Sequence, residues 1–203
     1  ADIEGAARIG SRVYWITSHG ASRTGKERLE RRRFFATDIT VSGDQVTIEP
    51  VGEPYVGLFD DLAQVPALQV LDLPGMAEDK VPPEDGSLNI EGLAAAPDGS
   101  LLVALRSPLT DNGAAIVIPL LNPAEVVMGG QPRLGTPEFL DLGTRGVRSI
   151  GAAGEGEGFV ISAGAAGDGI FELFRWRPAE SVEVDRLKAL TVDLQGLSPE
   201  ALS

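Results

Sequence analysis

The amino-acid sequence predicts an all-β protein of the β-propeller class, in which blades of four antiparallel strands follow one another along the chain. Short strand-like runs separated by turn residues are the first indication. The second is that sets of four such runs return three times over the 203 residues. The third is an acidic phrase that recurs at the first run of a set, as expected for a repeat architecture.

The first unit is expected over residues 1–54. Strand-like runs at 6–10 and 12–17 make one hairpin, and runs at 33–41 and 45–49 make a second hairpin. Glycine-containing turns join the paired runs, which is typical of hairpins. Four antiparallel strands in a row form a meander, the building unit of a propeller blade.

Residues 55–80 interrupt the strand pattern. Pro66 and Pro74 are expected to divide this segment, because proline ends or kinks a helix. Apolar residues at near-helical spacing predict one or two short helices inserted between the units: Leu58, Leu62, Val65, Leu68 and Leu71.

The second unit is expected over residues 88–143 and the third over 144–196, with the start of a further blade at 197–203. The expected strands of the second unit are 90–96, 101–105, 115–120 and 138–142, and those of the third are 147–153, 158–162, 170–176 and 187–194. The chain is therefore expected to form one partial propeller domain, with about three blades and the helical insertion.

The acidic phrase places a glutamate at one register in successive units. It reads Asp2-Ile3-Glu4-Gly5, then Asn89-Ile90-Glu91-Gly92, and finally Pro199-Glu200-Ala201. A β-sandwich also has short strands and frequent turns, but the repeated register favours the propeller. The third unit departs from the pattern, because Arg148 stands where the others carry a glutamate.

Composition excludes several classes of protein. The formal net charge of -13 opposes binding to nucleic acid or to anionic membrane surfaces. No apolar run approaches the roughly 20 residues of a membrane span. The absence of cysteine excludes disulfides, thiolate catalysis and zinc-thiolate sites. We expect a soluble protein, and composition does not decide between a cytoplasmic and a periplasmic or secreted location.

The repeated glutamates predict a polar site at one mouth of the propeller channel. The first strand of each blade lines the channel, so Glu4, Glu91 and Glu200 are expected to converge, with Asn89 close by. Such oxygen ligands suit a calcium ion (Ca2+), which accepts carboxylates and amide carbonyls in flexible geometry. Two alternatives stay open: the glutamates latch neighbouring blades together through hydrogen bonds, or they act in acid-base chemistry.

Basic residues cluster in one hairpin connection, residues 23–33. Arginine binds phosphate and carboxylate through paired hydrogen bonds, so Arg31 and Arg33 are candidates for binding an anion. The alternative is that they pair with acidic neighbours on the surface. Arg106 and Arg148 lie near strand ends in small or apolar surroundings, where an arginine either braces a carboxylate or binds an anion.

His19 is the only histidine of the chain and follows the end of an expected strand. It is the one side chain whose unperturbed pKa suits proton transfer near neutral pH, which makes it the candidate catalytic residue. The alternative is a purely structural histidine. No Gly-x-Ser-x-Gly nucleophile motif accompanies it.

Short phrases distributed over the whole chain form a distinctive set: Asp2-Ile3-Glu4-Gly5, Ser18-His19-Gly20, Arg31-Arg32-Arg33, Asn89-Ile90-Glu91-Gly92-Leu93-Ala94, Arg106-Ser107-Pro108, Gly146-Val147-Arg148-Ser149-Ile150 and Pro199-Glu200-Ala201-Leu202. Together they resemble a bacterial family of predicted propellers designated a domain of unknown function. That family is similar to phytase-like and esterase-like propellers, and more loosely to the strictosidine synthase, gluconolactonase and paraoxonase group. The resemblance implies further sequence before Ala1 and after Ser203, so that this chain corresponds to the middle of a ring.

Two functions of different classes follow. One is a metal-assisted hydrolase of a phosphoester, ester or lactone, in which the glutamates hold the metal while His19 or a water acts as the base. The other is a noncatalytic propeller that binds an anionic small molecule or a protein partner. An unclosed set of blades exposes strand edges and apolar faces, so association with the rest of its ring or with a second copy is expected.

Overall fold

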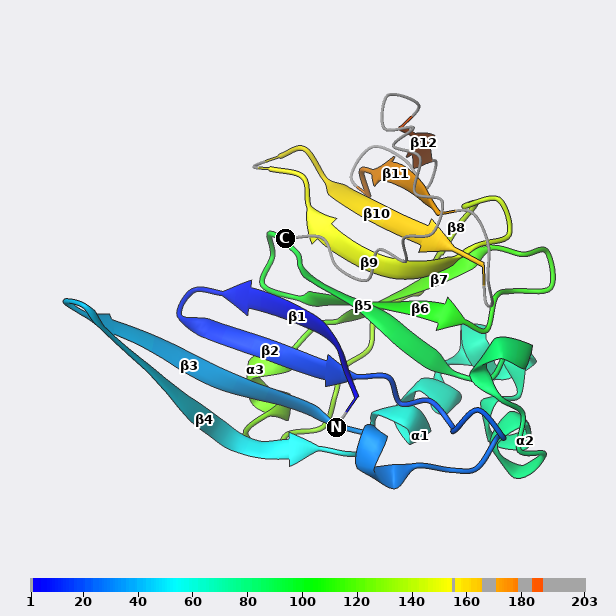
Figure 1. The fold of residues 1–203 in the computed structure, drawn as a ribbon, viewed down its shortest axis with the longest axis horizontal. Helices are drawn as coiled ribbons and strands as arrows, with labels where there is room; N and C mark the ends of the chain where they lie inside the picture. The colour runs from blue at the N-terminus through cyan, green and yellow to red at the C-terminus, as the bar shows by residue number, and fades with distance from the viewer. Residues whose placement is uncertain (1, 155, 166–170, 179–183, 188–203) are drawn as a thin grey trace.

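A computed structural model describes residues 2–154, 156–165, 171–178 and 184–187 of the chain (Figure 1). Within these residues the protein is mostly β, with three four-stranded antiparallel sheets. Each sheet runs in simple chain order: sheet 1 is β1-β2-β3-β4, sheet 2 is β5-β6-β7-β8 and sheet 3 is β9-β10-β11-β12. The all-β expectation is confirmed at this level.

The strands of each sheet lie next to one another in sequence, as hairpin turns dictate. Those of sheet 1 are β1 Ile3–Ile9, β2 Arg12–Thr17, β3 Phe34–Ser42 and β4 Gln45–Tyr55. Those of sheet 2 are β5 Asn89–Ala95, β6 Leu101–Ser107, β7 Ala115–Leu120 and β8 Glu138–Leu140. Those of sheet 3 are β9 Gly146–Ala152, β10 Phe159–Gly164, β11 Glu172–Trp176 and β12 Val184–Arg186.

The segment expected to be helical lies between sheets 1 and 2 and contains several short helices. They are α1 Leu58–Gln64, the 3-10 helix η2 Pro66–Leu71, α2 Leu73–Glu78 and the 3-10 helix η3 Pro83–Asp85. Pro66 begins η2 and Pro74 lies in the first turn of α2, so each proline opens a new helix instead of only ending one. Two further short helices are η1 Leu29–Arg31 and α3 Pro123–Val126.

Two apolar clusters hold the sheets together. In the first, residues of sheets 1 and 2, such as Ile16, Phe34 and Val103, pack with Leu58 and Leu62 of α1. In the second, Leu102 and Val117 of sheet 2 pack with Phe159, Ile161 and Trp176 of sheet 3. Sheet 2 is thus covered on both faces, and the helical insertion is part of the core between sheets 1 and 2.

The fourth strands differ from the expectation in two places. β4 continues to Tyr55, beyond the expected end at residue 49, and contains Pro50 and Pro54. It is an edge strand, where proline is tolerated because an outward N–H has no partner in the sheet. The fourth strand of sheet 3 is β12, before the expected run at 187–194; residues 188–194 and the expected blade start at 197–203 lie outside the described residues.

The first strands of the three sheets lie side by side, with β5 between β1 and β9 (Figure 1). Glycines allow this close approach. A Cβ on Gly5 of β1 would lie 2.9 Å from the Cβ of Leu93, and one on Gly92 of β5 would lie 2.9 Å from Cγ2 of Ile150. Larger side chains at these positions would push the sheets apart. No helix in the described part of the chain is long and apolar enough to cross a membrane.

Candidate functional site

A β-bulge occurs at the same place in the first strand of each sheet. Pairing with the second strand skips Glu4 in β1, Glu91 in β5 and Arg148 in β9. A bulge adds one unpaired residue and turns its side chain in a new direction. The repeated glutamate of the sequence and the arginine that replaces it are therefore structurally equivalent.

Glu91 lies buried at the centre of a charged cluster. Its Oε1 accepts a hydrogen bond of 2.8 Å from Arg106 of β6 and one of 2.9 Å from the side-chain amide of Asn89. Its Oε2 forms an ion pair with Arg148 of β9, whose Nε lies 3.0 Å away. We call Glu91, Arg106 and Arg148 the brace, because they join β5, β6 and β9 by charge.

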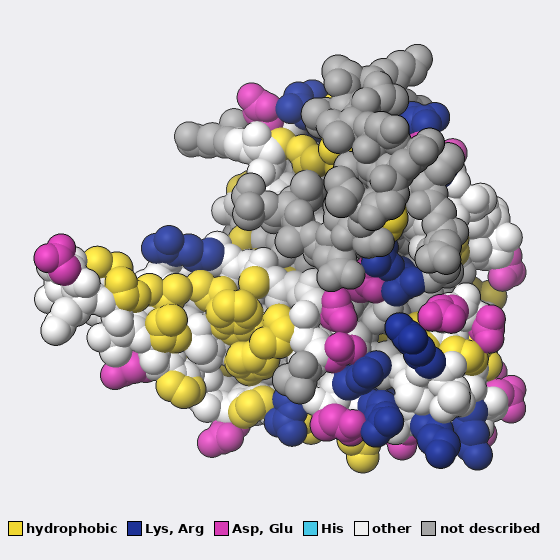
Figure 2. All heavy atoms as spheres, viewed as in Figure 1, with side chains coloured by type: hydrophobic (Ala, Val, Ile, Leu, Met, Phe, Trp, Pro, Cys, Tyr) yellow, Lys and Arg dark blue, Asp and Glu magenta, His cyan; other side chains and the backbone are white. Residues whose placement is uncertain are grey.

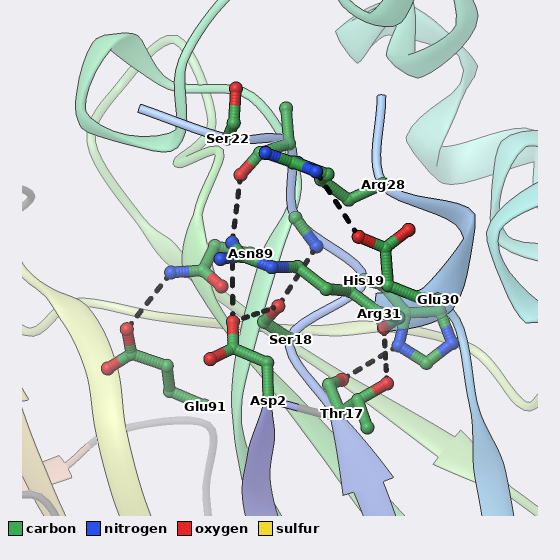
Figure 3. Close-up of polar contacts among 12 residues, drawn as sticks. Asp2, Thr17, Ser18, His19, Ser22, Arg28, Glu30, Arg31, Asn89 and Glu91 are labelled. Atoms are coloured by element: carbon green, nitrogen blue, oxygen red, sulfur yellow. Dashed lines mark hydrogen bonds and ion pairs between the residues drawn. The ribbon is translucent and has the colours of Figure 1, made fainter. Parts of the chain in front are cut away.

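A second polar group joins sheet 1 to sheet 2 beside the brace. Ser18 Oγ donates to Asp2 at 2.9 Å, and Arg31 lies 3.3 Å from the same carboxylate. The carbonyl of Ser18 accepts from the backbone N–H of Ile90 at 2.8 Å, which links the end of β2 to β5. Figure 3 shows Asn89 between Glu91 on one side and Asp2 and Arg31 on the other.

The calcium expectation stays a prediction. Among the residues described, no group of three or more His, Asp and Glu side chains is placed so that it could hold a metal ion. Glu91 faces two arginines, Glu4 is half-buried in β1, and Glu200 lies outside the described residues. The positive charges beside Glu91 disfavour a cation at that carboxylate.

The four arginines expected to bind an anion do not gather at one place. Arg106 and Arg148 belong to the brace. Arg31 contacts Asp2 and donates to the carbonyl of Ala21 at 3.2 Å. Arg33 is exposed and donates to the backbone carbonyl of Glu30 at 3.4 Å. The sequence left open whether Arg106 and Arg148 brace a carboxylate or bind an anion. In the structure both form ion pairs with the carboxylate of Glu91.

His19 is buried directly after β2, with a left-handed φ of 54°. Its Nδ1 lies 2.7 Å from the carbonyl oxygen of Thr17, so Nδ1 carries the hydrogen and Nε2 presents a lone pair. Burial lowers the pKa of His19 to about 4; nearby Arg32 acts in the same direction and the hydrogen bond to Thr17 opposes it. The ring is therefore neutral at pH 7 and unsuited to act as a general acid there.

His19 lines a small pocket between the end of β2 and the helical insertion. The pocket has a cavity volume of about 20 Å³. Phe59 of α1, Leu73 of α2 and Ser87, which precedes β5, complete its inner wall. His19 and Ser87 each have a buried polar atom, Nε2 and Oγ respectively, with no hydrogen-bond partner among the described residues. Buried polar atoms are nearly always bonded to protein or water, so a water or a ligand is expected to complete the hydrogen bonds of these two atoms.

Two arginines of the basic loop form the outer wall of the pocket. Arg32 is mostly buried, lies 4.0 Å above the ring of Phe59 and pairs with Glu27 at 3.0 Å. Arg28 is half-exposed and lies 3.5 Å from Glu30. Figure 2 shows Lys and Arg side chains, mixed with acidic ones, gathered over this part of the molecule.

The loop reaches the insertion through a glycine. Gly25 has a φ of +71°, and a Cβ there would lie 1.3 Å from the carbonyl oxygen of Lys80. Only glycine combines this backbone conformation with such a close approach. Gly25 also lines the pocket, so the contact positions the arginines at its mouth.

Sequence reasoning singled out His19 and the basic loop but did not join them to Ser87 and Phe59. A lone serine before a strand and a phenylalanine within a helical pattern carry no local signal of a site. Arg28 and Arg32 were part of the recognised basic run, but the sequence could not show that they rather than Arg31 and Arg33 face the pocket.

The fold is thus that of a mostly β protein with a repeated first-strand bulge. Residues 58–197 match the family described as protein of unknown function (DUF3616), and the chain belongs to this family. The expected membership of a family of unknown function is confirmed, while the similarity to phytase-like and esterase-like propellers stays a prediction. No curated protein matches the chain.

Proposed function

We propose that this protein is a noncatalytic propeller that binds an anionic small molecule in the pocket beside His19. The observation that carries the proposal is that two arginines line one cavity together with His19 and Ser87, each of which has a buried polar atom without a hydrogen-bond partner among the described residues. The proposal has three parts: the arrangement of the sheets as blades, the structural role of the brace, and the anion site.

The arrangement as blades is supported by register. The first residue after each bulge pairs with Ile16 in sheet 1, Ala104 in sheet 2 and Ser162 in sheet 3. The residues that precede these three in the second strands are Trp15, Val103 and Ile161, respectively. Val103 packs in the cluster with sheet 1, and Ile161 packs in the cluster with sheet 2. Successive sheets thus stack on the preceding one through equivalent positions, as the blades of a propeller do.

The same register supports the proposal that sheet 1 packs against a further sheet. Trp15, the equivalent of the fully buried Val103 and Ile161, is only half-buried and stacks on Phe35 at 6.3 Å between ring centroids. Figure 2 shows hydrophobic side chains gathered over sheet 1. We expect this face to pack against another blade of the ring or of a second copy.

Size-exclusion chromatography with light scattering checks this association. The purified protein is expected to form a larger species that Trp15→Lys disperses, because a charge on the face opposes burial. A monomer for both proteins would contradict the association but leave the pocket unaffected.

A binding role is favoured over metal-assisted hydrolysis by the brace. The hydrolase hypothesis needs carboxylates free to hold a cation, whereas Glu91 is neutralised by Arg106 and Arg148. The hypothesis also used His19 as a base. With a pKa of about 4, its neutral ring has a weak tendency to take up a proton at pH 7.

The anion site is supported by the donors at the pocket mouth. A guanidinium has five N–H donors, more than a single carboxylate uses, so Arg32 can bind a second anion while it contacts Glu27. Phe59 holds the guanidinium plane of Arg32 from one side. Arg28 adds a positive charge at the exposed edge.

The proposal is tested by titrating inorganic phosphate while following the ring signals of His19, the sole histidine. Phosphate should shift these signals, and Arg28→Gln should weaken binding by about fivefold to tenfold, less than a buried charged hydrogen bond because Arg28 is half-exposed. Arg133→Gln is the matched control, because Arg133 is an exposed arginine paired with Glu125 and is absent from the pocket lining. Equal weakening by both variants, or no shift at His19, would contradict the site.

A further inference from the structure

We infer that the ligand of the pocket is a small hydroxy acid, whose acid group binds Arg28 and Arg32 and whose hydroxyl binds His19 and Ser87. This inference rests on the proposed function and adds the chemistry of the inner wall to it.

The hydrogen bond that His19 already makes defines what its other nitrogen needs. Because Nδ1 donates to the Thr17 carbonyl at 2.7 Å, Nε2 can only accept. The side chain is buried, with 2% of its surface exposed, so bulk water does not satisfy this nitrogen. A molecule seated in the pocket must therefore offer a hydrogen-bond donor at this point.

Ser87 narrows the choice of donor. Its Oγ also lacks a partner within the described chain, and its own hydrogen needs an acceptor. A hydroxyl group donates one hydrogen bond and accepts another, so a hydroxyl that reaches both residues would match the acceptor of His19 and the donor of Ser87. An ammonium group only donates, and it would also stand near the positive charges of Arg28 and Arg32.

Size and polarity set the remaining limits. The cavity of about 20 Å³ admits about one water-sized group, so it takes a hydroxyl while the acid group lies at the mouth, and Phe59 and Leu73 make its remaining inner surface apolar. A short molecule with an anionic end toward the arginines and a hydroxyl toward His19 meets all these contacts. A water molecule could occupy the inner position alone, and the experiment must exclude that alternative.

The experiment compares three small anions and one zwitterion, glycine, as probes on the unmodified protein at pH 7. Glycolate carries a hydroxyl next to its carboxylate, acetate lacks the hydroxyl, methoxyacetate keeps only the acceptor, and glycine replaces the hydroxyl with an ammonium group. Dissociation constants are measured by titration, and the nitrogen-15 shift of His19 Nε2 reports hydrogen bonding at the ring.

Glycolate is expected to bind about tenfold more tightly than acetate, methoxyacetate and glycine, because only glycolate satisfies both buried atoms. It alone should move the Nε2 signal. Ser87→Ala is expected to reduce the preference for glycolate to about threefold while leaving acetate binding unchanged, because one of the two hydrogen bonds is lost.

The outcomes distinguish failure of the hydroxy-acid inference from failure of the proposed anion site. If acetate equals glycolate and both depend on Arg28, the anion site stands, a water fills the inner position and the hydroxy-acid inference is overturned. If neither anion binds and phosphate also leaves His19 unchanged, the inference and the proposed function both fail.

Discussion

Two buried polar regions, the brace and the pocket beside His19, differ in how their polar atoms are paired. The carboxylate of Glu91 has three side-chain partners, from β5, β6 and β9. In the pocket, Nε2 of His19 and Oγ of Ser87 have none among the described residues. Burial of a charge is tolerated when partners surround it, so the first region stabilises the fold. The second keeps unused hydrogen-bonding capacity, which is what a ligand site needs.

The largest effect on stability is expected when the carboxylate of the brace is removed. Glu91→Ala removes the carboxylate that Arg106 and Arg148 share and leaves their buried guanidinium groups without it. We expect the free energy of unfolding to fall by about 3–5 kcal/mol, the usual cost of removing one partner of a buried ion pair. Urea denaturation monitored by circular dichroism measures this change.

The matched control for this variant is Glu125→Ala. Glu125 pairs with Arg133 at 3.3 Å, but both side chains are more than 60% exposed. An exposed pair contributes about 0–1 kcal/mol, so this variant should unfold close to the wild type. If the two variants lost the same stability, Glu91 would not have the bracing role that its contacts indicate.

A second prediction concerns pH and the buried neutral ring. The unfolded chain takes up a proton on His19 near pH 6.5, whereas burial lowers the pKa in the folded protein to about 4. Between these values only the unfolded state gains the proton. Stability should therefore fall as the pH is lowered from about 6.5 to 4, and His19 should account for about 3 kcal/mol of that loss.

Denaturation at several pH values for the wild type and His19→Gln measures this contribution. The carboxylates titrate in both proteins, so the difference between the two curves isolates the histidine. That difference should change between pH 6.5 and 4 and stay constant above pH 7. Parallel curves over the whole range would show that His19 is not held neutral by burial.

The smallest changes in stability are expected when either of two buried serines is replaced by alanine. Ser18 Oγ donates to Asp2 at 2.9 Å and accepts from the N–H of Gly20 at 3.3 Å, so Ser18→Ala should cost about 1–2 kcal/mol. Ser87→Ala removes a hydroxyl without a partner in the described chain and should change stability by less than about 0.5 kcal/mol. Thermal or urea unfolding of both variants decides the point. A large loss for Ser87→Ala would mean that its hydroxyl already has a structural partner.

Much of the fold could be predicted from local pattern. Hairpin turns and apolar runs marked most strands, because each signal lies within a few residues. The fourth strands were the exception. Pro50 and Pro54 concealed the full length of β4, since their effect depends on whether the strand lies at an edge, and only strand pairing shows that.

The site was predicted only in part. The equivalent register of Glu4, Glu91 and Arg148 was visible in sequence, and the bulges show that these residues do occupy one position. The interaction that follows was not visible, because Arg106 meets Glu91 only through the pairing of β5 with β6. The prediction of a metal at these glutamates depended on neighbours that the sequence could not place.

By itself, the sequence determined the β class, the repeated unit, the helical insertion and the register of the charged residues. These features depend on period, turn chemistry and composition, which act over short stretches of chain. Tertiary structure alone decided that Glu91 is braced by two arginines and that His19, Arg32, Phe59 and Ser87 share a pocket. Those residues come from separate elements, and whether a buried polar atom is paired depends on which elements packing brings together.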